Sequence, residues 1–130
     1  TDILVKQFNN YVAIDTFHVN GELTLGENIA DLGGLTIAYY AFKKSIEGKP
    51  EPAKIDGFTA EQRFFLAWAQ GWRGNIRPEL LKNMLQTNPH APGNFRANGP
   101  PSNMQEFYDA FGVKEGDKMY RPKDERAVIW

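Results

Sequence analysis

The chain is 130 residues long, with 42% hydrophobic and 13% aromatic residues, no cysteine and a formal net charge of −1. This length suits one globular domain, and the near-neutral charge gives no electrostatic basis for binding nucleic acid or an anionic membrane surface. No apolar run approaches the roughly 20 residues that span a bilayer, and disulfides and thiolate metal ligands are excluded. Because the first residue is Thr1 rather than methionine, we expect the sequence to be part of a longer protein.

The first clear helix is predicted from about residue 26 to 47. Residues 1–23 precede it as an apolar stretch that ends in an Asn-Gly turn. Side chains along the middle of the helix are apolar nearly all round, which is typical of a buried helix. The Gly33-Gly34 pair inside it would permit the close approach of another backbone.

A capping box predicts the start of the second helix, after a loop over residues 48–57. Thr59 and Gln62 have the spacing at which each side chain caps the backbone of the other, and we expect the helix to stop near Gly74. Its aromatic face is more typical of a core than of a ligand site. That face consists of Phe64, Phe65, Trp68, Ala69 and Trp72.

Proline and glycine mark the elements that follow. Pro78 suits the first turn of a third helix that reaches about residue 86. Residues 88–101 hold too much proline and glycine for a helix or a central strand, so they predict a long, stiff loop. A fourth helix is expected to be capped from Ser102 and to end at Gly112. These elements predict a mostly α-helical fold.

Two acids stand four residues apart at the start of the first helix. Side chains at this spacing lie on one helix face, so Glu27 and Asp31 are neighbours. Acids entering a buried helix need a compensating cation, and a metal ion with an imidazole beside it would provide one. The pair therefore indicates half of a zinc site. A capping box of Thr24 and Glu27 explains the first acid without a metal, but Asp31 lies a turn deeper, where the helix dipole is weak.

The second candidate site is the stiff loop. Pro89 and Pro92 flank His90, whose imidazole could donate a hydrogen bond to an oxyanion. The guanidinium of Arg96 could clamp a carbonyl or a carboxylate. The spacing alone favours the alternative, in which His90 and Arg96 are solvated surface residues without a role in a site. His18 stands in an apolar stretch and is expected to be a hydrogen-bonded structural histidine.

Taken in order, these segments resemble the C-terminal part of the neprilysin family of zinc endopeptidases, peptidase family M13. The matching stretches are Asn20-Gly21, Thr24-Leu25-Gly26-Glu27-Asn28-Ile29-Ala30-Asp31, Gly33-Gly34-Leu35, Phe64-Phe65-Leu66-Ala67-Trp68-Ala69-Gln70, Arg77-Pro78-Glu79, His90-Ala91-Pro92-Gly93-Asn94-Phe95-Arg96 and the terminal Trp130. The resemblance covers almost the whole chain. It implies that residues 1–130 form one unit, the C-terminal part of a thermolysin-like (gluzincin) catalytic domain.

The resemblance implies a role for each candidate residue. Glu27 would be the third protein ligand of a catalytic Zn²⁺, and Asp31 would orient a zinc-bound histidine. His90 would stabilise the oxyanion of the tetrahedral intermediate, and Arg96 would hold a carbonyl of the peptide substrate. The other two ligands would be the histidines of an H-E-x-x-H helix, and a zinc-activated water would hydrolyse short peptides.

The H-E-x-x-H motif is absent from this chain. The resemblance therefore implies a parent enzyme with one Zn²⁺, in which this chain contacts the remainder of the catalytic domain. We expect the chain alone to bind zinc weakly or not at all, to cleave nothing, and to self-associate through the surface that the missing part would cover. The alternative is a non-catalytic helical binding or scaffold module with the family fold.

The absence of cysteine from this sequence also bears on the cellular compartment in which the enzyme acts. Arg73 and Ala127 stand where animal members of the family carry cysteine. We therefore expect a bacterial member that acts outside the inner membrane, as a periplasmic, cell-surface or secreted enzyme. The cytoplasm is the open alternative.

Overall fold

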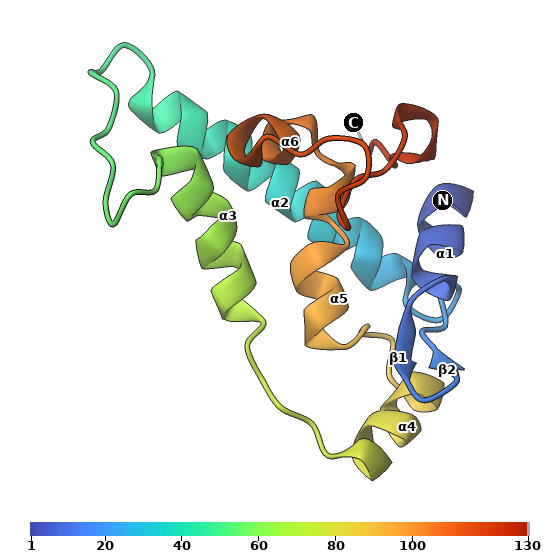
Figure 1. Cartoon of the computed structure of the whole chain (residues 1–130). Helices are drawn as coiled ribbons and strands as arrows, with labels where there is room; N and C mark the ends of the chain where they lie inside the picture. Colours follow the sequence, from blue (N-terminus) through green and yellow to red (C-terminus); the bar gives the residue numbers. More distant parts are fainter. Residues whose placement is uncertain (130) are drawn as a thin grey trace.

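The computed structural model describes residues 1–129, which are mostly helical (Figure 1). In chain order the elements are α1 (Asp2–Asn9), β1 (Val12–Ile14), β2 (Phe17–His18), α2 (Leu25–Ile46), α3 (Ala60–Gly71), α4 (Pro78–Thr87), α5 (Gly93–Asn98), the 3-10 turn η1 (Pro101–Asn103), α6 (Gln105–Phe111) and the 3-10 turn η2 (Lys123–Glu125). The mostly α-helical fold that the sequence predicts is confirmed. Trp130, one of the residues that carry the family resemblance, lies outside the described residues.

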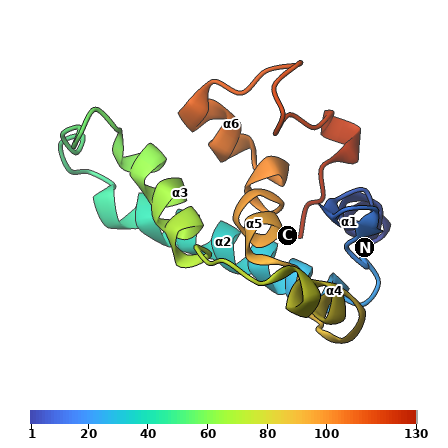
Figure 2. The ribbon, with the colours of Figure 1, turned by 60° about the horizontal axis from the view of Figure 1, so that its bottom comes forward.

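The long helix α2 runs through the molecule, and the shorter helices are arranged along it (Figure 1 and Figure 2). Its bounds agree with the prediction to within a residue at each end. One side of α2 is buried through Leu32, Leu35 and Tyr39. The middle of the opposite side is exposed although it carries no charge: Ile37 is 57% exposed, and a Cβ built at Gly34 meets no described atom outside the neighbouring helix backbone within 4 Å. This helix therefore has apolar residues on both faces but packs through only one of them.

Three of the local signals in the sequence are confirmed. Gln62 donates its backbone N–H to Thr59 Oγ1 at 3.2 Å, and Thr59 donates its own N–H to Gln62 Oε1 at 3.0 Å, so the capping box opens α3. Pro78 occupies the first turn of α4. Gly112 ends α6 in the left-handed conformation, with φ of 64°.

The prediction of an unbroken loop over residues 88–101 is wrong, because α5 and the start of η1 lie within it. Pro92 is the N-cap of α5, and the next prolines follow only after its last residue, Asn98. Proline is compatible with both places, since neither removes a hydrogen bond from the helix interior. The cap predicted for the fourth helix is also wrong. Ser102 lies in η1 and donates to the Gly99 carbonyl, and α6 begins after Met104 without a side-chain cap.

The first 23 residues hold more regular structure than the sequence indicated. Helix α1 is followed by an antiparallel hairpin, in which Val12 pairs with His18 and Ile14 with Phe17. The hairpin lies beside α4. Its turn places Asp15 at a positive φ of 52°, a conformation that aspartate tolerates better than most residues.

The hydrophobic core joins elements from the whole length of the chain. Its buried members are Leu4, Phe8, Val19, Leu32, Leu35, Tyr39, Phe65, Leu85, Ala91, Met104 and Ala127. A buried polar network ties α1 to the C-terminal segment: Asn103 donates to Gln7 Oε1 at 2.9 Å and accepts from the backbone N–H of Ala127 at 2.8 Å. Together these contacts fix the position of η1 directly after α5.

Within residues 1–129, none of the helices combines the length and the apolar character that crossing a bilayer requires.

Candidate functional site

The start of α2 presents Glu27 and Asp31 on one side of the helix, as the spacing predicts. The capping-box alternative for Glu27 is wrong, because Thr24 makes no side-chain cap. Instead Thr24 Oγ1 donates to the Asn20 carbonyl at 2.8 Å and accepts from Asn28 Nδ2 at 2.9 Å. The carboxylate of Glu27 is therefore not used to start its own helix.

Helix α5 brings Arg96 onto Asp31. Arg96 Nε donates to Asp31 Oδ2 at 2.7 Å, and Arg96 Nη2 donates to Asp31 Oδ1 at 2.8 Å. The two side chains are only 14% and 9% exposed. Two parallel hydrogen bonds between a guanidinium and a carboxylate are the strong, directional form of an ion pair, and here the pair is largely removed from water.

The loop before α5 brings His90 onto Glu27. His90 Nε2 lies 3.1 Å from Glu27 Oε2, and the two side chains are 45% and 39% exposed. On the other side of the ring, Asn88 Oδ1 lies 2.9 Å from His90 Nδ1 and also accepts the backbone N–H of His90 at 2.9 Å. The ring of His90 is thus held from both sides, by Glu27 at Nε2 and by Asn88 at Nδ1.

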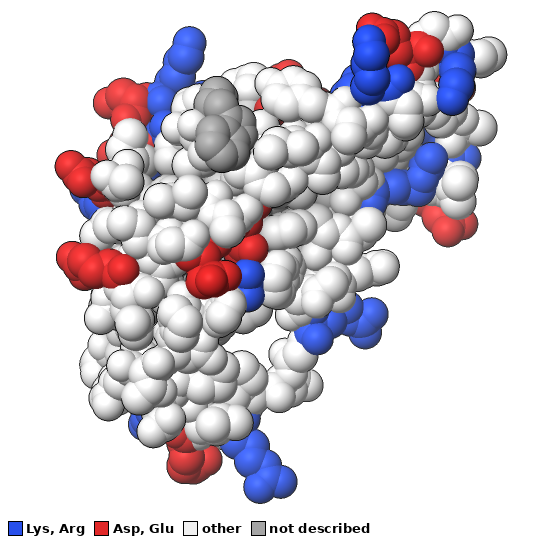
Figure 3. Space-filling view, turned by 180° about the vertical axis from the view of Figure 1, so that it is seen from behind, with Lys and Arg blue, Asp and Glu red and all other residues white. Residues whose placement is uncertain are grey.

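The two ion pairs form one cluster. Arg96 Nη2 lies 3.9 Å from Glu27 Oε2, so the guanidinium stands between the two acids. In the view from behind, a compact group of acidic and basic atoms lies within a largely uncharged area, while most other charges lie toward the edges (Figure 3). The structure therefore brings together all four candidate residues, although α2 and α5 are far apart in the sequence.

Two tryptophans of α3 and its C-cap complete the surroundings of Arg96. The guanidinium carbon lies over the Trp72 ring, 3.9 Å from its centroid, and Trp68 Nε1 donates to the Arg96 carbonyl at 3.2 Å. The sequence indicated only core packing for these rings, and their link to Arg96 was missed. Their four-residue spacing was the available signal, since it places both rings on one face of α3.

His18 is hydrogen-bonded as expected, with Nδ1 2.7 Å from the Asn9 carbonyl, but its surroundings differ from the expectation. The side chains of Phe17 and His18 are exposed, and only Val19 is buried. The short strand β2 turns both side chains outward, so this histidine is not part of the core.

The described residues, 1–129, do not by themselves place three protein ligands around one position, as a catalytic zinc ion requires. Within residues 1–129, no group of three or more histidine, aspartate or glutamate side chains is placed to hold a metal. A catalytic zinc site needs three protein ligands, and the one carboxylate suggested here, that of Glu27, is engaged by His90.

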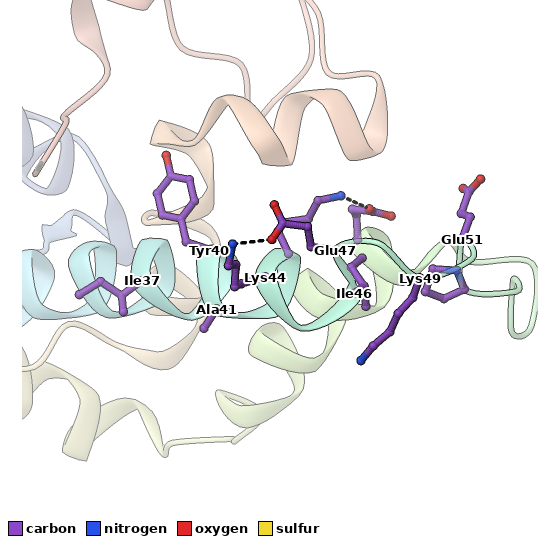
Figure 4. A pocket seen from close by; sticks show the side chains of 11 residues that line it. Ile37, Tyr40, Ala41, Lys44, Ile46, Glu47, Lys49 and Glu51 are labelled. Carbon is purple, nitrogen blue, oxygen red and sulfur yellow. Dashed lines mark hydrogen bonds and ion pairs between the residues drawn. The ribbon is translucent and has the colours of Figure 1, made fainter.

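A separate groove of about 950 Å³ runs along the C-terminal half of α2 (Figure 4). The exposed Ile37 and Tyr40 line it, and among its charged side chains Lys43 pairs with Glu61 and Lys44 pairs with Glu47. Lys43 Nζ lies 2.8 Å from Glu61 Oε1, which raises the pKa of Lys43 and lowers the pKa of Glu61 through their hydrogen bond. None of the four candidate residues lines this groove.

The chain matches the family described as Peptidase family M13 over residues 1–127. It is 45% identical over 121 residues to an endothelin-converting enzyme homolog of Locusta migratoria, covering 92% of this chain and 16% of that protein. It is 41% identical over 115 residues to human neprilysin, covering 87% of this chain and 15% of that protein.

A solved structure of a zinc metalloprotease is also similar to this chain. The crystal structure of the Mycobacterium tuberculosis zinc metalloprotease Zmp1 in complex with inhibitor superposes on 99% of this chain with a TM-score of 0.94 and 41% identity, covering 20% of that chain. The expected fold, a mostly helical part of a thermolysin-like catalytic domain, is confirmed by this match. The chain spans a fifth or less of the length of each of these three proteins.

Proposed function

We propose that this chain, which belongs to peptidase family M13, is the C-terminal portion of the catalytic domain of a zinc endopeptidase that hydrolyses short peptides. Family membership supports a zinc metallopeptidase activity in general. The observation that carries the more specific proposal is the convergence of Glu27, Asp31, His90 and Arg96 on one cluster. Residues 1–130 would act as one unit with the remainder of that domain.

Glu27 is proposed as the third protein ligand of the zinc ion. Its carboxylate is 39% exposed, and its close contacts within residues 1–129 are to two cationic or protonatable groups, His90 and Arg96. A carboxylate that is exposed to this extent retains oxygen lone pairs that a metal ion could use. When bound, zinc would supply Lewis-acid activation of water at neutral pH.

Asp31 and His90 are proposed to act beside the metal. Both carboxylate oxygens of Asp31 are fixed by Arg96, and each retains a lone pair that could accept a hydrogen bond from a histidine ligand. His90, held at Nδ1 by Asn88, presents Nε2 toward the position of Glu27. From there it could donate a hydrogen bond to an oxygen that becomes negative during hydrolysis.

Arg96 is proposed to hold the substrate. Its Nε and Nη2 are occupied by Asp31, whereas Nη1 donates to no other residue in the range 1–129. This remaining edge of the guanidinium has two N–H groups for a peptide carbonyl. The ion pair with Asp31 would fix where that edge points.

The uncovered face of α2 is proposed as the contact with the remainder of the catalytic domain. Gly34, Ile37, Ala38 and Ala41 lie along this face, are exposed and carry no charge. A helix that is apolar on both faces is typical of one buried on both sides. In the chain alone, we expect this face to drive self-association, which sedimentation at increasing concentration would detect.

The absence of cysteine supports a bacterial enzyme that is independent of disulfides. We propose that it acts outside the inner membrane, with the cytoplasm as the alternative compartment. Fractionation of cells that express the longer protein would distinguish the two.

The function is tested by assaying the longer protein against short internally quenched peptides. We expect cleavage that a chelator abolishes, and a loss of at least about a hundredfold in kcat/KM for His90→Ala. Folded, zinc-loaded protein without cleavage would contradict the proposal. An upstream sequence lacking H-E-x-x-H would favour the alternative of a helical scaffold module.

The isolated chain gives an independent test. Calorimetric titration of this chain with zinc should show weak binding or none, and the same peptides should remain uncut. Tight one-to-one binding that disappears in both His18→Ala and Glu27→Ala would reveal a self-contained metal site and overturn this interpretation of the chain.

A further inference from the structure

Trp72 contacts Arg96, and the function proposed above gives this tryptophan no role. The Arg96 guanidinium lies over its ring at 3.9 Å from the centroid, well within the roughly 6 Å at which a cation interacts with an aromatic face. The Arg96 side chain is 14% exposed, so little water competes for this contact. The guanidinium is therefore held by an acid at its edge and by an indole at its face.

These two contacts restrain different movements. Asp31 binds Nε and Nη2, which lie along one edge of the planar guanidinium. A planar group held along one edge can still tilt about that edge. A ring stacked on its face blocks the tilt, so Trp72 restricts the movement that Asp31 permits. The direction of the remaining Nη1 then depends on both contacts.

The surroundings of Trp72 indicate that its ring is held by packing and not by a hydrogen bond of its indole N–H. Its Nε1 is buried and has no hydrogen-bond partner within residues 1–129, whereas a buried indole N–H usually finds one. Packing holds the ring instead, with Trp68 at 5.2 Å between ring centroids and an interplanar angle of 70°. The backbone also approaches closely here, because a Cβ built at Gly93 would lie 2.6 Å from the Trp72 carbonyl oxygen.

We propose that Trp72 is a positioning residue for Arg96: by stacking on the guanidinium, it directs the free Nη1 edge toward the carbonyl of a bound peptide. The stacking is a property of this chain alone. The substrate part of the inference rests on the proposed function.

The stacking is tested in this chain by nuclear magnetic resonance of the Arg96 Nε–Hε group. In Trp72→Leu, we expect loss of the ring-current shift of the Arg96 side chain and faster exchange of Hε with water. Trp72→Phe should retain part of the shift, and it keeps the test open if the leucine variant fails to fold. Phe64→Leu, which removes another half-buried ring of α3, is the matched control and should leave the Arg96 signals unchanged. Identical Arg96 signals in wild type and in both Trp72 variants would overturn the inference.

The positioning role is tested in the longer protein by steady-state kinetics. We expect Trp72→Leu to lower kcat/KM about tenfold, mainly through KM, and Trp72→Phe to recover most of the loss. In an Arg96→Ala background, Trp72→Leu should have no further effect, because the group that it positions is already gone. The same tenfold loss in that background would show that Trp72 acts independently of Arg96. If the longer protein cleaves no peptide, the proposed function fails, and the resonance measurement alone decides whether Trp72 holds Arg96.

Discussion

Asp31 and Arg96 are 65 positions apart in the chain and form a two-hydrogen-bond ion pair, with donor–acceptor distances of 2.7 Å and 2.8 Å. This pair connects the N-terminal part of α2 to α5. Both side chains are largely shielded from water, so the Asp31 charge depends on Arg96 for compensation, and the Arg96 charge depends mainly on Asp31, with Glu27 farther away at 3.9 Å. The pair therefore contributes both to the position of the candidate site and to the stability of the chain.

Replacing one member of this pair should be costly. For Asp31→Asn, we expect the free energy of unfolding to fall by about 3 kcal/mol, because Arg96 loses the acid that it binds through two hydrogen bonds and keeps only the more distant Glu27, with little solvent as a replacement. Chemical denaturation of the isolated chain measures this change.

The matched control is Asp15→Asn. Asp15 Oδ2 lies 2.8 Å from Lys82 Nζ, but the two side chains are 63% and 40% exposed. Asparagine also tolerates the positive φ at this position. We expect a loss below about 1 kcal/mol, as for other surface pairs. Equal losses for the two substitutions would show that the Asp31–Arg96 pair is effectively solvated.

The two glycines of the site region should respond in opposite directions. A Cβ at Gly93 would lie 2.6 Å from the backbone oxygen of Trp72, so Gly93→Ala forces α3 and α5 apart and should cost about 1–3 kcal/mol. A Cβ at Gly34 would meet no described atom within 4 Å beyond the adjacent helix backbone, so Gly34→Ala in the interior of α2 should stabilise the isolated chain by about 0.5–1 kcal/mol. Thermal unfolding compares the two variants, and stabilisation by Gly93→Ala would contradict the close approach.

The buried amide of Asn103 should matter for the connection between the chain ends. Asn103→Ala leaves Gln7 Oε1 and the backbone N–H of Ala127 without their partner, which should cost about 1–3 kcal/mol. Hydrogen exchange should show faster opening of the amide at Ala127. Asn98→Ala removes an exposed amide that reaches only the Asn94 carbonyl, and a change within about 0.5 kcal/mol is expected there.

Acid should weaken the ion pair between Lys43 and Glu61. The hydrogen bond from Lys43 lowers the pKa of Glu61 below its ordinary 4.5 in the folded chain. The pair's contribution is then complete above about pH 4.5 and is lost as the pH falls through the lowered pKa, because the unfolded chain takes up the proton first. The pair is partly exposed, so we expect a contribution of at most about 1 kcal/mol. Denaturation curves from pH 7 to pH 3 should fall less steeply for Glu61→Gln, and identical slopes would contradict this assignment.

Much of the fold could be predicted because its signals are local. The apolar run of α2, the Thr59 capping box, the proline at the start of α4 and the glycine after α6 all depend on residues within one or two turns. Helix α5 could not be predicted in this way. From the sequence alone, Gly93 is interpreted as a helix breaker. In the structure, glycine is required at this position because a Cβ would lie 2.6 Å from the carbonyl oxygen of Trp72, which is distant in the sequence.

The four candidate residues could be proposed from the sequence, whereas their contacts with one another could not. The i, i+4 spacing places Glu27 and Asp31 on one face of α2, and the family resemblance supplies His90 and Arg96. Which acid pairs with which base depends on how α5 docks on α2, and no local pattern encodes that docking. The stacking of Trp72 on Arg96 was missed for the same reason.

The central claim is that Glu27 is one ligand of a catalytic zinc ion and that residues outside this chain provide the other ligands. The zinc content of the longer protein tests this claim most directly. Metal analysis after gel filtration should find about one equivalent in the wild type and less than about a tenth of an equivalent in Glu27→Gln, since a catalytic site loses one of its three protein ligands. Glu22→Gln, a nearby substitution outside the cluster, should keep its zinc. A folded Glu27→Gln protein that retains a full equivalent of zinc would contradict the account.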